Sequence, residues 1–270
     1  MKIAILITTY NRGELLKHSL ERMVNLTLPN EILIVDDGSS DGTEAIVSNF
    51  KDRLPIRYIY NHNPQWSICS MARNIGVKNT DADLIITTEP EMIWVTDLIP
   101  IFLEERKKYP NEIISASIIY HGQPSSMYNP GFATDPELAL KGEIVEDYQI
   151  QPRSYHPSGY CKTINMQATF IASYERKWLL EIGGWDEEFE GCWGWDDVDL
   201  ATRLRVNGIN QHICKKLQAI HQFHGHPPQE MWVKGSQMNE QRFKMKNLQD
   251  NKNPYIIANR DKEWGVIKIR

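Results

Sequence analysis

Three carboxylates directly follow a tryptophan-glycine-tryptophan string in the second half of this 270-residue chain. Asp196, Asp197 and Asp199 come after Trp193-Gly194-Trp195. A positioned carboxylate can take a proton from a hydroxyl group as a general base, and an aromatic face offers a flat apolar surface on which a sugar ring can stack. The alternative is the acidic first turn of an ordinary helix, Asp197–Val206, because acidic residues favour helix N-termini. Both interpretations can hold together, but only the first accounts for the two tryptophans.

Three further polar groups each stand at the end of an apolar run. Ligands of open parallel sheets bind beyond the carboxyl ends of the strands, so these groups are candidates for one shared cleft. The second group also fits an ordinary turn with a helix cap. The three groups are Thr9-Tyr10-Asn11-Arg12, Asp36-Asp37-Gly38-Ser39 and Glu89-Pro90-Glu91.

Alternating apolar runs and helical stripes are the elements that must position these residues. Such alternation predicts an α/β protein with a mostly parallel, doubly wound sheet. In the first half, strands are predicted over Lys2–Thr8, Glu31–Val35, Ile56–Tyr60 and Leu84–Thr88, and helices over Gly13–Asn25, Thr43–Phe50 and Ser67–Lys78. In the second half, strands are predicted over Glu112–Tyr120, Ala168–Ala172, Asn210–Cys214 and Gln218–Ile220, and helices over Tyr174–Ile182 and Glu230–Leu248. The segment His121–Ser158 is rich in proline, glycine and polar residues, which predicts a long loop.

Composition limits the classes of protein that fit. A hydrophobic content of 41% with 24% charged residues is typical of a soluble globular protein. The formal charge of −5 argues against broad nucleic-acid binding. No apolar run reaches the length of a membrane span, so we expect no integral membrane segment. The four cysteines are scattered without metal-ligand spacing, which favours a reducing, cytoplasmic location.

Four motifs in this order give the chain a family resemblance. They are ILITTYNR near the start, IVDDGSSDGT, ARNIG at Ala72–Gly76, and GGWDEEFEGCWGWDDVDLATRL. Together they resemble the GT-A nucleotide-sugar glycosyltransferases, most of all family 2, and the last block is shared with galactosyltransferases and polysaccharide-polymerising enzymes. The resemblance implies a GT-A (Rossmann-like) fold, with a mostly parallel central sheet flanked by helices and a C-terminal helical tail. It divides the chain into a domain over 1–228, with a nucleotide-binding half (1–91) and an acceptor half (92–228), and an extension over 229–270.

The resemblance also implies a nucleotide site at the first two strand ends. In the family, the first strand end and the acidic turn hold the nucleotide base and the ribose. The matching residues are Thr9, Tyr10, Asn11, Arg12, Asp36 and Asp37. Arg73 matches a family helix that lines the same cleft, where it is expected to make a charge-assisted bond near the donor; the alternative is a surface arginine.

A divalent cation is the third implication, and here the chain departs from the family pattern. The usual Asp-x-Asp is replaced by Glu89-Pro90-Glu91. Glutamate is still a hard oxygen ligand, suited to Mn²⁺ or Mg²⁺, so Glu91 is expected at the metal and Glu89 at the ribose or at the metal through water. His221 resembles a late family histidine that is commonly a third ligand, with His224 and His226 as alternatives. The alternative is that Glu89-Pro90-Glu91 is an exposed acidic loop that binds no metal.

Carried over onto the last block, the family mechanism makes Asp197 the general base and Asp196 the group that binds acceptor hydroxyls. Trp193, Gly194 and Trp195 would line the acceptor or sugar site, and Asp199 is expected to pair with Arg203 at i+4. The expected activity is inverting transfer from a UDP-sugar to a hydroxyl of a glycan or glycoconjugate. A catalytically silent nucleotide-sugar or carbohydrate binding module is the alternative. A nucleotidyltransferase would need a glycine-rich phosphate loop, which TTYNRGELLK lacks. Oligomers could form through the C-terminal extension.

Overall fold

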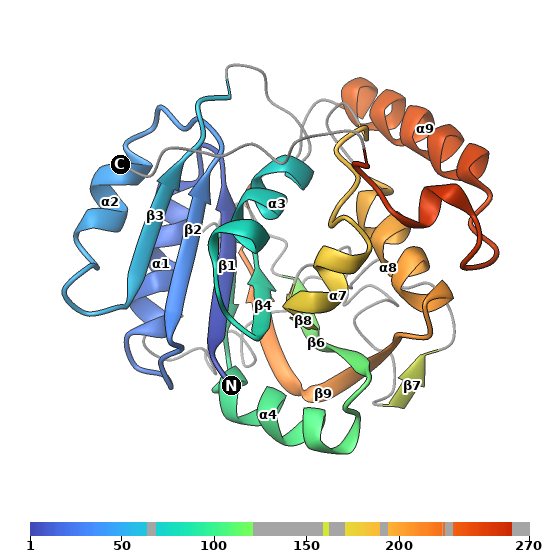
Figure 1. Ribbon diagram of the computed structural model, residues 1–270. Coiled ribbons are helices and arrows are strands. Elements are labelled where there is room, and N and C mark those ends of the chain that lie inside the picture. The colour runs from blue at the N-terminus through green and yellow to red at the C-terminus, as the bar shows by residue number, and fades with distance from the viewer. Residues whose placement is uncertain are drawn as a thin grey trace.

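One twisted sheet forms the centre of the molecule, described here by a computed structural model over residues 1–63, 69–120, 159–161, 171–189, 194–222, 224 and 229–260 (Figure 1). Four neighbours at one side, β3-β2-β1-β4, are parallel, and the order continues through β8-β6-β9-β5, with β7 paired to β9. β8 is antiparallel to its neighbours β4 and β6, whereas β6 and β9 are parallel to each other. The strands are β1 (Ile3–Thr9), β2 (Glu31–Asp36), β3 (Ile56–Tyr60), β4 (Leu84–Thr88), β5 (Met92–Trp94), β6 (Glu112–Tyr120), β7 (Gly159–Cys161), β8 (Ile171–Glu175) and β9 (Asn210–His221).

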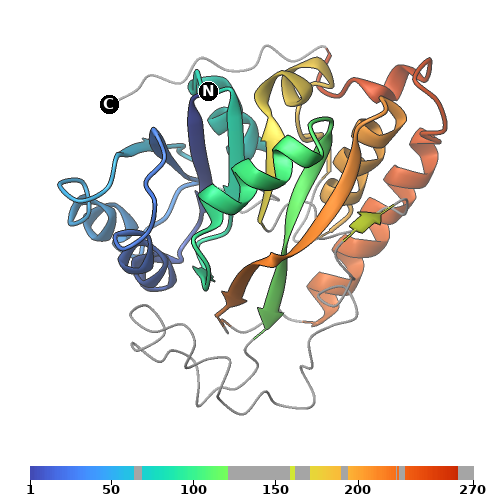
Figure 2. The ribbon, with the colours of Figure 1, turned by 90° about the horizontal axis from the view of Figure 1, so that it is seen from below.

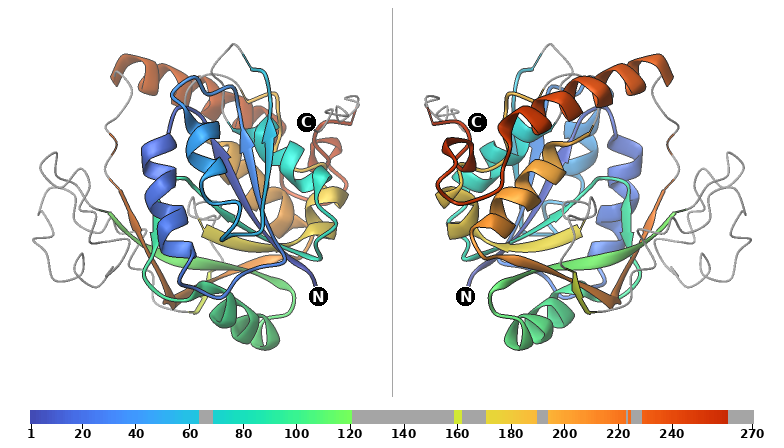
Figure 3. Two further views of the ribbon diagram at one scale, coloured as in Figure 1. Left: turned by 90° about the vertical axis from the view of Figure 1, so that its left-hand side faces the viewer. Right: turned by 90° about the vertical axis from the view of Figure 1, so that its right-hand side faces the viewer.

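Helices cover both faces of this sheet. Figure 1 shows α4 beneath the lower end of the sheet, and Figure 2, seen from below, shows it in front of the strands. Figure 3 shows α9 at the opposite end of the molecule from α4. The described helices are α1 (Gly13–Met23), α2 (Thr43–Ser48), α3 (Ser70–Asn79), α4 (Leu98–Lys108), α7 (Arg176–Glu181), α8 (Asp196–Val206), α9 (Gln229–Lys246) and the short 3-10 helix η5 (Pro254–Ile256).

Strand side chains alternate between two cores, one on each face. Ile5 and Ile7 of β1 pack in a core with α1, α2 and α4, whereas Leu6 packs in a second core with α3, α7 and α8. Because both faces are covered, the parallel strands are apolar throughout rather than alternating. Gly76 lets α3 approach β1 closely, since a Cβ at this position would lie 2.2 Å from the Leu6 side chain.

The strand-helix alternation predicted from the sequence is confirmed, with three differences. Tyr174 was predicted to begin a helix, but it lies in β8 and α7 begins at Arg176. The two weak strands predicted after α8 are one continuous strand, β9, whose register against β6 shifts between Cys214 and Gln218. α4, β5 and β7 were not predicted. The tail Trp264–Ile269, the predicted loop His121–Ser158 and the first part of the predicted strand Ala168–Ala172 lie outside the described residues.

Candidate active site

The carboxyl ends of three parallel strands meet at one edge of the sheet. Thr9 of β1 pairs with Asp36 of β2, and Ile7 pairs with Thr88 of β4, so the polar residues that follow these strands are neighbours. The backbone N–H of Asp37 donates to the Thr9 carbonyl at 2.8 Å. Thr9 Oγ1 is buried without a hydrogen-bond partner among the described residues. A buried hydroxyl without a hydrogen-bond partner could bond to a polar group of a ligand at the strand ends.

The two acids of the turn after β2 have different surroundings. Asp36 shapes the turn, because it accepts from the backbone N–H groups of Gly38 and Ser39 at 3.1 and 2.7 Å. Asp37 is 6% exposed and accepts from the side-chain amides of Asn61 and Asn63 at 2.7 and 3.0 Å. Burial raises the pKa of Asp37 above its ordinary value. Asp37 is therefore a buried carboxylate at the strand ends that is held by two side-chain amides, whereas Asp36 is used within the turn.

The loop after β1 is tied to the same turn. Asn11 adopts a left-handed backbone with φ of 50°, and its side-chain oxygen accepts from the backbone N–H of Ser40 at 2.8 Å. Its own N–H donates to Ser39 Oγ at 2.7 Å. Tyr10 and Arg12 on either side are half-buried. The contacts of Asn11 give it a structural task, whereas no such task is seen for the half-buried side chains of Tyr10 and Arg12 among the described contacts.

Arg73 joins three carboxylates that come from distant parts of the chain. From α3, its guanidinium donates to Glu89 at 2.7 Å, to Asp196 at 3.0 Å and to Asp197 at 3.3 Å. The arginine is 6% exposed, and its guanidinium lies 5.6 Å from the ring of the fully buried Trp185. The guanidinium of Arg73 therefore joins the segment after β4 to the first turn of α8, because it pairs with an acid from each.

Burial is the largest cause of the pKa shifts of Glu89 and Asp196 in this cluster. It raises the pKa of Glu89 to about 7, against the lowering effect of Arg73. It also raises the pKa of Asp196 to about 7, with the neighbouring Asp197 charge acting in the same direction. Three carboxyl groups therefore share one guanidinium near neutral pH. The side chain of Asp197 is 19% exposed, compared with 12% for Glu89 and 7% for Asp196, so Asp197 is the most accessible of the three.

Glu91 lies in a second group, with two histidines. His221 Nε2 and His224 Nε2 each lie 3.5 Å from Glu91 Oε1, and one donor atom from each residue lies within 4.8 Å of the others. The histidines hold the pKa of Glu91 well below its usual range despite burial. Two imidazole nitrogens and one carboxylate oxygen form a donor set that leaves coordination positions open for a ligand. These residues therefore fit a divalent cation, and Glu89 bonds to Arg73 instead.

The local backbone places Glu91 against β9. Ser19 Oγ donates to the Pro90 carbonyl at 2.6 Å, and the backbone N–H of Gln222 donates to the Glu91 carbonyl at 3.0 Å. β5 then runs antiparallel to β9, so Met92 is opposite His221. His226, the other predicted ligand, lies outside the described residues.

The tryptophan string is only partly described. Trp193 lies outside the described residues, whereas Gly194 and Trp195 have positive φ values of 89° and 73°. The Trp195 ring lies 5.4 Å from the ring of Phe243 in α9. Trp195 is half-buried, so one of its sides is packed on this partner helix.

Asp199 pairs with Arg203 as predicted, at 2.7 Å and fully buried. The sequence interpretation did not single out Asn61, Asn63, Trp185 or Lys246. A signal for the first two was present, because NHN follows the apolar strand β3 as the other polar groups follow theirs. Lys246 gave no such signal, since it is one of three lysines spaced along the last helical stretch.

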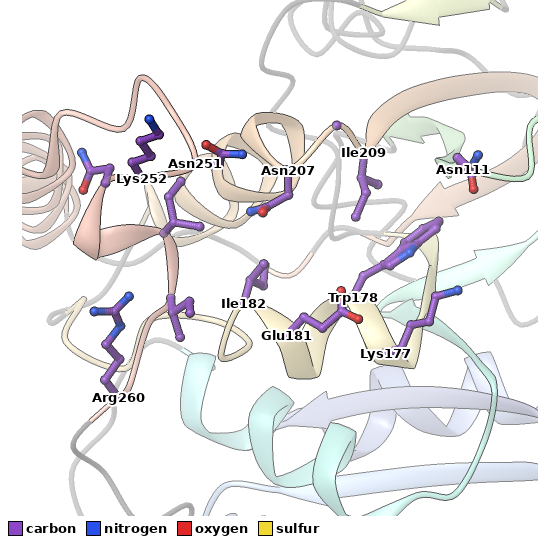
Figure 4. A pocket seen from close by; sticks show the side chains of 14 residues that line it. Asn111, Lys177, Trp178, Glu181, Ile182, Asn207, Ile209, Asn251, Lys252 and Arg260 are labelled. Carbon is purple, nitrogen blue, oxygen red and sulfur yellow. The ribbon is translucent and has the colours of Figure 1, made fainter.

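A cavity of about 470 Å³ lies elsewhere, at the edge of the sheet where β6 and β9 begin (Figure 4). It lies between α7, the start of β9 and the segment that contains η5, and its lining includes Trp178, Ile209 and Lys252. Register places this edge opposite to the acids, because Glu175 pairs with Leu84 at the beginning of β4. None of the acids or histidines described above lines it, so we take the carboxyl edge as the candidate active site.

Comparisons with known proteins report a family match and sequence relatives for this chain. The family described as Glycosyl transferase family 2 matches residues 4–182. A chondroitin synthase of Pasteurella multocida (strain Pm70) is 25% identical over 82% of this chain, and a hyaluronan synthase of Pasteurella multocida is 26% identical over 84%. The chain spans 24% and 25% of the lengths of these two proteins.

Two solved structures show the same fold. The chain resembles S. aureus TarS 1-349 with a TM-score of 0.61 at 13% identity, covering 82% of this chain and 60% of that one. It resembles a mannosyltransferase from Pyrobaculum calidifontis, solved with GDP-Man and Mn²⁺, with a TM-score of 0.60 at 16% identity, covering 94% and 66%. These matches confirm the expected α/β fold, a curled and mostly parallel GT-A sheet flanked by helices. Within the described residues, no helix combines the length and the apolar character needed to cross a bilayer.

Proposed function

The chain belongs to glycosyl transferase family 2, and on that premise we propose that it moves a sugar from a UDP-sugar to a hydroxyl group of a carbohydrate or glycoconjugate, with inversion at the anomeric carbon. One observation carries this proposal: a single buried guanidinium, Arg73, holds the acid at the end of β4 together with the two acids at the start of α8. The first belongs to the nucleotide-binding half and the other two to the acceptor half.

The base in this proposal is Asp197. It is the most exposed carboxylate on Arg73, so an acceptor hydroxyl can approach it from solvent. Asp196 lies deeper and binds a second acceptor hydroxyl, and its raised pKa lets it donate as well as accept near neutral pH. One base on the acceptor side, facing the donor held by the strand ends, gives attack opposite the leaving group and therefore inversion. The Trp-Gly-Trp string would cover the sugar, with Trp195 braced by α9.

The nucleotide lies against the ends of β1, β2 and β3 in this proposal. Asp37, supported by Asn61 and Asn63, accepts from the N3–H of uracil, and the buried Thr9 Oγ1 supplies a polar group at the strand end. Tyr10 and Arg12 flank the base and ribose, whereas Asn11 and Asp36 shape the loops. The solved structure of TarS with UDP-GlcNAc supports a UDP-sugar as the donor on this fold.

Glu91, His221 and His224 would hold a divalent cation, Mn²⁺ or Mg²⁺. Such an ion supplies positive charge to the departing diphosphate. The donor set described above supports this assignment, as does the Mn²⁺ in the mannosyltransferase complex. Glu89 accepts from Arg73 through Oε1 and is not part of the three-residue donor set, so its proposed task is to fix Arg73 next to the donor.

The experiment begins with calorimetry of UDP, with and without Mn²⁺, followed by a hydrolysis screen of nucleotide sugars. Asp197→Asn should then lower kcat at least about 10²-fold, as expected for loss of a general base, while the Kd for UDP stays within a factor of about two. Asp81→Asn is the matched control, because Asp81 is an exposed carboxylate at the opposite edge of the sheet.

Two outcomes would contradict the proposal. Full activity of Asp197→Asn would remove the base assignment. Tight UDP binding by the wild-type protein without turnover of any donor would favour a silent binding module.

A further inference from the structure

A buried ionic network connects α9 to the helix that carries the acids. Lys246, the last residue of α9, places Nζ 2.5 Å from both Asp199 and Asp186. Asp199 also accepts from Arg203 at 2.7 Å. The side chains of Lys246, Asp199 and Asp186 are 6%, 0% and 5% exposed. Buried charges are costly unless they are paired, so this network has one favourable arrangement, in which α9 is locked onto α8.

The same network fixes the loop that supports Arg73. Arg203 donates to the carbonyls of Ile182 and Gly184 at 2.8 and 2.7 Å. Asn259, beyond α9, donates to the carbonyls of Gly183 and Trp185 at 2.8 and 2.7 Å. Gly183 has φ of 75°, and a Cβ there would lie 2.1 Å from the Ala258 carbonyl oxygen. Ala258 and Asn259 therefore pack on the loop at residues 182–185, and the last residue of that loop, Trp185, lies beside Arg73.

The first turn of α8 is braced from the same side. Trp195 precedes the helix in a left-handed conformation that a residue with a side chain rarely adopts, and such a conformation persists only where its surroundings enforce it. The contact between the rings of Trp195 and Phe243 helps to hold Trp195 in this conformation. Asp199 and Asp197 are two residues apart, which places them on opposite sides of the helix. Holding Asp199 toward α9 therefore points Asp197 toward Arg73.

We infer that Lys246 is a positioning residue for the acids of α8. It acts through Asp199, fixing the rotation of α8 about its axis, and it contacts neither Asp196 nor Asp197. A misplacement of about 1 Å at a reacting group can cost about 10²-fold in rate, so a loosened α8 should slow catalysis while leaving nucleotide binding intact. The effect on rate rests on the proposed function, and the effect on α8 does not. The family match ends at residue 182, before α8 and α9 begin.

The test uses the full chain and the double variant Lys246→Met with Asp186→Asn. The pair of changes removes one positive and one negative charge, so no newly unpaired carboxylate is left at Asp186, and Asp199 keeps Arg203. We expect kcat to fall at least about tenfold, with the Kd for UDP within a factor of about two. Hydrogen exchange of residues 195–200 should speed up at the same time. Lys244→Met, an exposed lysine one half-turn away, is the control and should change neither.

Lys246→Arg is the second variant. It keeps the positive charge and therefore the fold, but a planar guanidinium is bulkier than the ammonium that lies 2.5 Å from both carboxylates in this buried space. The carboxylates must therefore shift, and we expect a smaller fall in kcat, again with an unchanged Kd for UDP. Unchanged kcat and unchanged exchange in either folded variant would overturn the inference. Wild-type protein that turns over no donor would count against the proposed function alone, because the exchange measurement still decides whether Lys246 positions α8.

Discussion

Replacing Arg73 by methionine tests the central cluster most directly. The change removes the only guanidinium that the described structure places on Glu89, Asp196 and Asp197, and it keeps most of the apolar bulk beside Trp185. Breaking a buried ion pair by removing one partner costs about 3 to 5 kcal/mol. For a chain of this size that corresponds to a lower Tm by roughly 6 to 20 °C.

The size of this loss should depend on pH. Burial raises the pKa of Glu89 and of Asp196 to about 7, above their ordinary values. These two groups therefore bind protons more tightly in the folded protein than in the unfolded chain between about pH 4 and pH 7, and their contribution to stability falls as pH rises through that interval. Arg73 opposes both shifts. Without it the two pKa values rise further, so above about pH 7, where both groups are already ionised in the wild type, the variant should go on losing stability by up to about 1.4 kcal/mol per group for each unit of pH.

Thermal unfolding of both proteins at pH 5 and pH 8 measures this difference. The Tm gap should be clearly wider at pH 8, because protonated carboxyls at pH 5 no longer need the cation. Other titrating groups, Glu91 included, are common to both proteins and cancel in the comparison. Arg53→Met, at an exposed arginine over the Phe50 ring, should shift stability by only about 0.5 kcal/mol at either pH. Equal gaps at the two pH values would refute the electrostatic account and leave packing as the cause.

Three further predictions follow from the site and the fold. Mn²⁺ should support more activity than Mg²⁺, because two of the three described donors are nitrogens and Mg²⁺ prefers oxygen ligands; His221→Ala should weaken Mn²⁺ binding measured by calorimetry, and an unaltered Kd would contradict the assignment. Asp37→Asn should weaken UDP binding about tenfold through loss of a charge-assisted hydrogen bond, with kcat at saturating donor nearly unchanged; a normal UDP Kd would remove Asp37 from the site. Gly76→Ala should lower the free energy of unfolding by about 1 to 3 kcal/mol through overpacking against Leu6, as measured by urea unfolding, and Leu6→Val in the same chain should recover part of the loss if that contact is the cause.

Much of the sheet could be predicted from the sequence because its strands are short, apolar and separated by turn residues. β3 and β4 have the predicted bounds, since each is a short run rich in β-branched or aromatic residues between polar segments. α4 was missed because its apolar residues are packed beside charged ones in a short stretch, LIPIFLEERKK, which contains a proline. β9 was divided in two because Lys215 and Lys216 interrupt its apolar pattern, and those lysines lie at the irregularity opposite Ala116.

The site could be predicted in its parts but not in its connections. Strand-end chemistry singled out Asp37 and Glu91, and the last motif singled out Asp197. Sequence order carries no information about which acid meets which cation, so Glu89 was expected at the ribose or the metal, whereas its partner is Arg73. The buried ionic network of Lys246 could not be predicted either, because a lysine on a polar helix is usually solvated and only the packing of α9 buries it.

The close approach of Gly183 to Ala258 also sets an order for events during synthesis. The strands β1 to β3 find their partners within the first 60 residues, so that side of the sheet can be complete early as the chain leaves the ribosome. The loop at Gly183 precedes its partners Ala258 and Asn259 by about 75 residues, so those contacts form only after these two residues have emerged. A stop codon placed just before those residues would yield a chain in which α8 keeps its contacts with Lys246 and Phe243, whereas the loop at Gly183 lacks the contacts of Ala258 and Asn259.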